Sequence, residues 1–168
     1  MSSPLIKQKS ESFPLGYTAI TTEGESGLDV GMDFGIHMQG PDDVFEETHQ
    51  KETVWLLMNG KAQLEFDGQT HTVERTSLFD EAPTALHLGP NTPLKITALS
   101  EDVEWSVSRC KTDYEFKPML FTPKDLNPEY RGKGLVGDTC LRNVRLIFDK
   151  TVRDEGNLVI GEVINLPG

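Results

Sequence analysis

The side chains that could do acid–base chemistry in this sequence are four histidines and two pairs of neighbouring carboxylates. The pairs are Asp42–Asp43 and Glu46–Glu47, which lie in one short acidic stretch. A carboxylate acts as a general base near neutral pH when burial or a neighbouring charge raises its pKa. This stretch offers no evident desolvating context, so we expect solvated carboxylates. His71 follows a predicted turn and His37 lies on the less apolar side of a predicted strand, so we expect both at the surface.

A second group of chemically capable residues is basic, in a chain that is otherwise acidic. It consists of Arg131, Lys133, Arg142 and Arg145, and glycines at 132 and 134 allow close approach of the backbone there. Arginine binds carboxylates with two parallel hydrogen bonds, so these residues are candidates for contact with an acidic substrate. The alternative is a charged connector that forms salt bridges with the acidic remainder of the chain.

The elements that must position these residues are short strands, concentrated in residues 49–99. Asn59–Gly60 and Asp67–Gly68 are dipeptides suited to tight hairpin turns, and residues 62–66 alternate between apolar and polar. Runs of similar character predict further strands at residues 54–58, 70–73, 77–79, 84–88 and 94–99. Only an antiparallel all-β architecture packs so many strands with such short connections.

The same pattern extends on both sides of this stretch. Strands are predicted at residues 17–22, at residues 28–38, where the alternation is longest, and at residues 103–107. Trp55 and Trp105 lie in these strands and are expected in the core. We therefore predict a small barrel or sandwich in residues 1–110, which begins with a polar extension over residues 1–15.

Composition and charge exclude several classes of protein. The chain of 168 residues carries 27 acidic and 16 basic residues, a net charge of −11 that repels nucleic acid and anionic membranes. Two cysteines are too few for a disulfide framework, and no apolar run approaches a membrane span or a signal-peptide core. We expect a cytoplasmic protein that binds neither nucleic acid nor membrane.

After the predicted barrel the pattern changes. Residues 111–142 show neither helical nor strand periodicity for long, which predicts a connector. Two further strands are predicted at residues 143–149 and 158–165, so residues 143–168 are either the first strands of a second domain or strands that complete the first barrel or a dimer. Exposed strand edges at this end favour a homodimer or a larger homo-oligomer.

Several segments resemble a known family. Gly60 after the first run and Pro83 before a later strand are similar to a cupin barrel. The more specific segments are Ser77–Asp80, Leu120–Asp125, Arg131–Gly134, Asn157–Val163 and Pro167–Gly168, which resemble the 5-deoxy-glucuronate isomerase family of inositol catabolism. That family is related to the 4-deoxy-5-hexosulose-uronate ketol-isomerases of pectin breakdown.

The resemblance implies a fold and an activity. Members are two-barrel cupins that convert a sugar-acid aldose to a ketose, with a divalent metal, zinc or manganese, that polarises the carbonyl. Their metal ligands lie in the second barrel, beyond the counterpart of Pro167–Gly168. The chain therefore looks like an N-terminal portion of such an isomerase, a cupin barrel with the start of a second, incomplete one, and without a metal of its own.

The resemblance also indicates where a metal would bind in the first barrel. Metal-binding cupins use three histidines and a glutamate. Counted back from Gly60, the first two histidine positions fall on Glu47 and His49 and the glutamate position on Thr53, while the third histidine position falls near His87. Glu52 adjoins the carboxylate position but points to the other face of a strand. A weak mixed site of Glu47, His49 and His87 and a barrel mouth without metal are both open, and we favour the second.

Two functions follow. Either the protein is a 5-deoxy-glucuronate isomerase-like enzyme whose structural barrel lies here, or the chain is a non-catalytic cupin for dimerisation or small-ligand binding. A metal-dependent oxygenase of the small-cupin type is a third and weaker option, because the metal ligands are incomplete.

Overall fold

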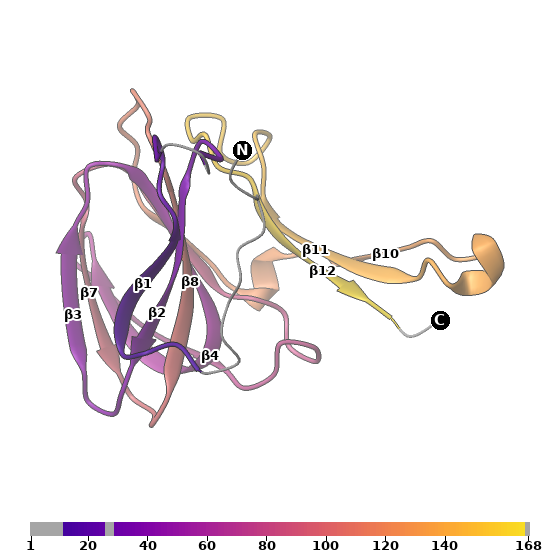
Figure 1. Cartoon of the computed structure of the whole chain (residues 1–168), viewed down its shortest axis with the longest axis horizontal. Coiled ribbons are helices and arrows are strands. Elements are labelled where there is room, and N and C mark those ends of the chain that lie inside the picture. The colour runs from indigo at the N-terminus through magenta and orange to yellow at the C-terminus, as the bar shows by residue number, and fades with distance from the viewer. Residues whose placement is uncertain (1–11, 26–28, 167–168) are drawn as a thin grey trace.

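The computed structural model describes residues 12–25 and 29–166. Three predicted features lie wholly or partly outside the described residues. They are the polar extension at residues 1–15, the start of the strand at Leu28, and the Pro167–Gly168 turn. Two sheets form a barrel, and a third, three-stranded sheet extends sideways from it (Figure 1). No helix in the described ranges has the length and apolarity needed to cross a membrane.

The barrel consists of two antiparallel sheets that share one strand. The first sheet has the order β1 (Gly16–Thr21), β2 (Asp33–Gln39), β8 (Val103–Cys110), β4 (Glu52–Phe66), β6 (Ala85–Leu88) and β9 (Met119–Phe121). In the second sheet β7 (Pro93–Ala98) pairs with β3 (Val44–Thr48) and with the second half of β4, which also pairs with β5 (Gln69–Arg75). The predicted antiparallel all-β barrel is confirmed.

The predicted hairpin at Asn59–Gly60 is wrong. β4 continues through it for 15 residues. The first half pairs with β6 and β8, and the register shifts between Leu57 and Asn59, where the strand bends into the second sheet. Gly60 has a φ of +97°, and a Cβ placed on it would lie 2.2 Å from the carbonyl oxygen of Asp102. Glycine serves here to bend a strand next to another backbone, a use that the dipeptide pattern does not distinguish from a turn.

The other short-range predictions have mixed outcomes. The Asp67–Gly68 hairpin is confirmed, since both residues have positive φ and Phe66 pairs with Gln69. The predicted strand at residues 77–79 is wrong, because this segment is a turn. Ser77 Oγ contacts Asp80 Oδ2 at 2.7 Å, so side-chain hydrogen bonds replace strand pairing here.

The core of the barrel is built around the two tryptophans. Trp55 and Trp105 are fully buried, as predicted, and their rings meet edge to face with centroids 6.1 Å apart. The aliphatic side chains around them come from both sheets, and include Leu57, Leu64, Leu86, Leu88, Ile96 and Val107. A second apolar cluster lies on the outer face of the first sheet, where Val54 and Ala85 pack against Phe148 and Leu158.

The segment predicted as a connector contains more structure than expected. β9 pairs with β6, and so adds a strand to the barrel. β10 (Glu129–Arg131), β11 (Arg142–Phe148) and β12 (Ile160–Asn165) form the third sheet, and two short 3₁₀ turns, Pro123–Asp125 and Val136–Asp138, lie between β9 and β11. The predicted strands at 143–149 and 158–165 correspond to β11 and β12. We call residues 129–165 the arm, because its sheet projects away from the barrel (Figure 1).

Buried arginines fix the arm to the barrel. Arg75, which is 1% exposed, binds the carboxylate of Glu162 on β12 with Nη1 and Nη2 at 2.7 and 2.9 Å. Arg145 on β11 donates to the backbone carbonyls of Leu78, Phe79 and Glu81. Charge-assisted hydrogen bonds of this kind orient both partners. The base of the arm is therefore held in one position relative to the barrel.

Candidate functional site

The barrel mouth, where a cupin would hold its metal, contains an arginine. Arg109 extends the alternation of Val103, Trp105 and Val107 by two residues, so its side chain points into the barrel and is only 5% exposed. Its Nη2 lies 2.8 Å from both carboxylate oxygens of Glu47. The guanidinium lies 4.9 Å from the centre of the Tyr17 ring. Continuing the alternation to residue 109 would have revealed this residue from the sequence.

A second ion-paired group lies beside Arg109 at the mouth. Lys51 Nζ contacts Asp33 at 2.7 Å and Glu23 at 3.0 Å. The backbone N–H of Lys51 donates to Nδ1 of His49 at 3.0 Å. Burial, and then the charge of Arg109, lower the pKa of His49. The mouth is thus occupied by paired charges, and the crevice between Glu47, His49, Thr53 and Leu88 is narrow.

The structure does not bring the three predicted metal ligands together. Glu47 and His49 lie at the mouth, but His87 points to the outer face of the first sheet. The residue of β6 that faces the barrel opposite Thr53 is Leu88, one position further along. His87 instead stacks on Phe148 with ring centroids 4.5 Å apart. A shift of one residue along a strand exchanges the two faces of the sheet, so a motif count that is one position off selects the wrong side.

The residues at the mouth do not fit a divalent metal. No group of three or more His, Cys, Asp or Glu side chains in the described part of the chain could hold a metal ion. The charge of the buried Arg109 guanidinium also opposes the entry of a second cation beside Glu47. Arg109 therefore stands in the mouth as a fixed cation, and its counter-ion is the carboxylate at the first predicted ligand position.

His87 belongs to a buried network on the other side of the sheet. Glu52 and His87 are both fully buried, and His87 Nε2 lies 2.9 Å from Glu52 Oε1. Arg153 donates from Nε to His87 Nδ1 at 3.0 Å, so the ring proton must lie on Nε2 and point at Glu52. The backbone N–H groups of Asn157 and Leu158 donate to Glu52 at 2.6 and 2.9 Å. The network joins the barrel to the loop that leads into β12.

This buried network has a structural role and not a catalytic one. Burial, reinforced by the nearby Glu52 carboxylate, raises the pKa of the Cys110 thiol to about 12, so Cys110 is not a thiolate nucleophile near neutral pH. A Cβ on Gly156 would lie 2.8 Å from Glu52 Oε1 and from His87 Cε1. The loop thus covers the carboxylate closely, which leaves no position for a substrate beside it.

The predicted substrate-binding cluster is divided by the structure. Arg145 is 5% exposed, and its guanidinium is engaged by three backbone carbonyls, so it does not face solvent with the others. Arg131, Lys133 and Arg142 are exposed on the arm. Arg131 lies opposite Arg142 on neighbouring strands, and it contacts Glu129 at 2.5 Å. Substrate contact by these three residues stays a prediction.

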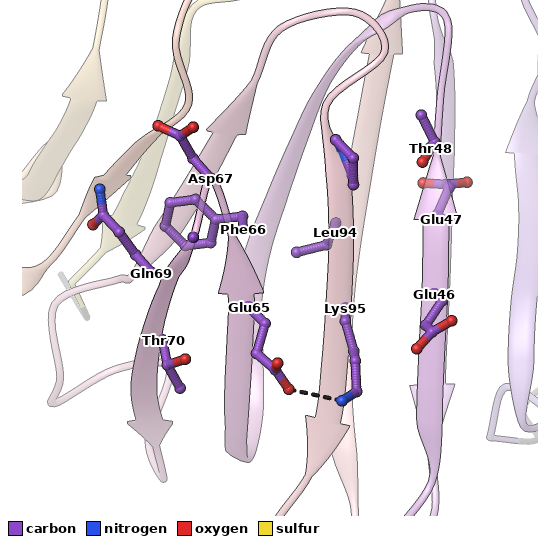
Figure 2. A pocket seen from close by; sticks show the side chains of 12 residues that line it. Glu46, Glu47, Thr48, Glu65, Phe66, Asp67, Gln69, Thr70, Leu94 and Lys95 are labelled. Atoms are coloured by element: carbon purple, nitrogen blue, oxygen red, sulfur yellow. Dashed lines mark ion pairs between the residues drawn. The ribbon is translucent and has the colours of Figure 1, made fainter.

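A broad hollow lies at one end of the second sheet, and we call it the acidic hollow. Its volume is about 730 Å³. It is lined by residues of β3, β4, β5 and β7, which include Glu46, Glu47, Glu65, Asp67, Gln69, Thr70, Pro93, Leu94, Lys95 and Phe66 (Figure 2). Lys95 pairs with Glu65 at 2.9 Å, so the remaining carboxylates give the hollow a net negative charge.

The interior of the barrel contains a histidine that the strand pattern placed at the surface. His37 is 3% exposed and packs between the rings of Phe45 and Trp55, with centroids at 4.4 and 5.4 Å. Burial, and then the charge of Arg109, lower the pKa of His37 from 6.5 to about 4. The expected surface location is wrong because residues 33, 35 and 37 face inward near the barrel mouth, where polar side chains are also enclosed.

We expect acid to destabilise the barrel through His37. In the unfolded chain His37 is protonated below about pH 6.5, whereas in the folded chain it stays neutral until the pH falls to about 4. The free energy of unfolding therefore decreases by about 3 kcal/mol over this range. Urea unfolding at a series of pH values measures the slope. That slope is set by the number of protons taken up on unfolding, and His37→Phe should reduce this number by close to one. An unchanged slope would contradict a buried, neutral His37. Burial lowers the pKa of His87 as well, which adds in the same direction.

A sequence model of the KduI/IolB family matches residues 7–168. Among solved structures, the chain is similar to an IolB-like protein from Salmonella typhimurium LT2, with a TM-score of 0.75, 19% identity, and coverage of 90% of this chain and 57% of that chain. YlbA from E. coli has a TM-score of 0.55 at 11% identity, over 78% of this chain and 54% of that one. The plu4264 protein from Photorhabdus luminescens has a TM-score of 0.51 at 9% identity, over 66% and 89%. No curated protein sequence matches the chain.

The fold and the mouth together define an all-β barrel protein in which an internal ion pair stands at the position where the resemblance predicted a metal. Because the family match extends over almost the whole chain, the chain belongs to the KduI/IolB family, which is the 5-deoxy-glucuronate isomerase family predicted from its segments. The solved structures share too little sequence to show more than the fold. The chain spans 57% of the length of the IolB-like protein.

Proposed function

We propose that the chain acts in the aldose–ketose isomerisation of a deoxy sugar acid, 5-deoxy-glucuronate or a close relative, as a barrel that does not itself hold the catalytic metal. The family match over residues 7–168 is the observation on which the proposed reaction rests. The ion pair between Arg109 and Glu47 supports placing the metal outside this barrel.

In this proposal the chain's own residues have positioning roles. The buried network of Glu52, His87 and Arg153 and the contacts of Arg75 with Glu162 hold the arm in a fixed direction from the barrel. A fixed direction matters because a catalytic unit supported from such an arm needs its groups held to within a fraction of an ångström. The mouth of this barrel carries no chemical step in the proposal, since its side chains do not fit a metal.

A second candidate function is a non-catalytic cupin that binds a small ligand or mediates assembly. The observation that favours it is the same Arg109, because a cation buried at a barrel mouth could receive a small carboxylate in place of Glu47. This candidate requires neither a metal nor turnover.

Turnover and metal content of the purified protein distinguish the two candidate functions. We expect conversion of 5-deoxy-glucuronate to its ketose, followed by NMR, to require manganese or zinc. Bound metal, measured by mass spectrometry, should be the same in Glu47→Gln and His49→Gln as in the unaltered protein. A loss of metal in those two variants would place the ion at this mouth and contradict the proposal. A protein with neither bound metal nor turnover would support the non-catalytic candidate.

A further inference from the structure

Three polar atoms inside the barrel have no hydrogen-bond partner in the part of the chain that the structure describes. They are Nε of Arg109, Nδ1 of His37 and Nε1 of Trp55, and each belongs to a side chain that is at most 5% exposed. The rings of His37 and Trp55 have centroids 5.4 Å apart, and the Arg109 guanidinium lies 5.9 Å from the Trp55 ring. A buried polar group without a partner is costly, so a cluster of such groups indicates that a polar molecule binds beside them.

The ion pair between Arg109 and Glu47 uses only part of the guanidinium. Nη2 alone contacts both carboxylate oxygens of Glu47, at 2.8 Å each, and Nε is left without a partner. Arginine binds a carboxylate most strongly through two parallel hydrogen bonds, from two nitrogens to two oxygens. Glu47 does not form this arrangement from its place on β3, whereas a free carboxylate can turn until it does.

Glu47 is also the carboxylate at the mouth that has room to leave. Its side chain is 21% exposed, and it lines both the narrow crevice at the mouth and the acidic hollow (Figure 2). The other charges beside it cancel, because two lysines contact two carboxylates: Lys51 with Asp33 and Glu23, and Lys111 with Glu23. When Glu47 turns toward the hollow, Arg109 is therefore the uncompensated charge, and an anion restores the balance.

Hydrogen-bond donors near Arg109 indicate the rest of the ligand. The backbone N–H of Lys51 donates to Nδ1 of His49, so the proton of the neutral ring lies on Nε2, at the same crevice. The Tyr17 ring lies 4.9 Å from the guanidinium and crosses Gly35, where a Cβ would lie 2.5 Å from Tyr17 Cζ. Burial raises the pKa of Tyr17, so its hydroxyl stays protonated. N–H and O–H donors beside a cation favour a carboxylate with a hydroxyl or carbonyl oxygen next to it.

We propose that the barrel mouth binds a small hydroxy or oxo acid, whose carboxylate replaces that of Glu47 on Arg109. Glu47 occupies the position when the acid is absent and turns toward the acidic hollow when the acid binds. Because the crevice is narrow, only the carboxylate end enters, and a longer acid extends out of the mouth. This inference rests on the second candidate function, whose ligand class it names, and it requires no turnover.

Titration of the full chain with glycolate tests the site, at an ionic strength held constant with sodium chloride. We expect calorimetry to give a dissociation constant of about 1 mM or lower for glycolate, and no binding of ethylene glycol, which lacks the carboxylate. The two tryptophans report the position by NMR. The indole N–H signal of Trp55 should shift, because it has no partner and lies near Arg109, whereas that of Trp105, which donates to Gln39 at 3.3 Å, should move less.

Variants at the mouth assign the binding to Arg109. Glu47→Gln removes the competing charge and keeps the size of the side chain, so it should tighten glycolate binding by about tenfold or more. Arg109→Gln should abolish binding. Glu46→Gln is the matched control, because this exposed neighbour on β3 loses the same charge away from Arg109 and should leave the affinity unchanged. Tryptophan fluorescence checks folding, and Glu47→Gln decides the test if Arg109→Gln does not fold.

The outcomes separate this site from the proposed reaction. Absence of glycolate binding, equal binding of ethylene glycol, or an affinity that Glu47→Gln leaves unchanged would overturn the inference. Turnover of a sugar acid without binding at Arg109 would contradict the inference and leave the proposed isomerisation standing. Binding at Arg109 without turnover would support the inference and count against the isomerisation.

Discussion

Replacing Glu52 by glutamine is expected to lower the free energy of unfolding by about 3–5 kcal/mol, although the two side chains have nearly the same shape. The buried carboxylate accepts from His87 and from the backbone N–H groups of Asn157 and Leu158. An amide in its place turns an NH₂ group toward donors and leaves buried N–H groups unsatisfied. Urea unfolding measures the loss, and hydrogen exchange at Asn157 and Leu158 should accelerate before the rest of the chain.

The lowered pKa of Glu52 makes the stability contributed by these hydrogen bonds depend on pH. Burial alone would raise the pKa of Glu52, but the hydrogen bonds from His87, Asn157 and Leu158 outweigh it and lower the pKa below its usual value of 4.5. The carboxylate therefore stabilises the fold above about pH 4.5, and this contribution is lost as pH falls through the lowered value. Glu65→Gln is the matched control, because its pairing with Lys95 is exposed to solvent and therefore contributes little to stability. Equal losses in the two variants would contradict the structural role of Glu52.

Gly60→Ala is expected to cost about 3 kcal/mol or more and to reduce the yield of folded protein. The added Cβ would meet the Asp102 carbonyl oxygen at 2.2 Å and the Val103 Cα at 2.9 Å, and both are backbone atoms that cannot rotate away. The positive φ of Gly60 adds conformational strain for any residue with a side chain. Thermal unfolding and the soluble fraction after expression measure the effect.

Gly68→Ala separates the two contributions. Gly68 also has a positive φ, of +71°, but a Cβ there would meet no atom within 4 Å. Its cost should therefore be about 1 kcal/mol, which is the conformational part alone. If both alanine variants lost the same stability, the steric conflict at the strand bend would be disproved.

The strands that the sequence predicted well are those with strict alternation and buried aromatic residues. Trp55 and Trp105 lie where two-residue periodicity placed them, because the interior of a barrel selects large apolar side chains at every second position. The Asp67–Gly68 turn was predictable for a similar reason, since its residues satisfy a specific pair of positive φ values.

The candidate site was less predictable because it depends on which face of a strand a residue occupies. His87 and Leu88 differ by one position, and only the pairing with Thr53 in β4 decides which of them enters the barrel. The alternation of β8 could have placed Arg109 inside the barrel, but its contact with Glu47, 62 positions earlier in the chain, could not be predicted from the sequence. Arg153 was likewise invisible, since its partner His87 comes from a distant strand. Contacts of long sequence separation are set by tertiary packing, which local patterns do not encode.

The bend in β4 has a consequence for how this protein folds during its synthesis. β4 is shared by both sheets, and its partner β8 does not end until Cys110. While the chain emerges, β4 can form its hairpin with β5 but must wait for some forty further residues before its first half is enclosed. During that interval the apolar edge of the first half of β4 lacks its β8 partner, which is the kind of exposed edge through which incompletely folded chains aggregate.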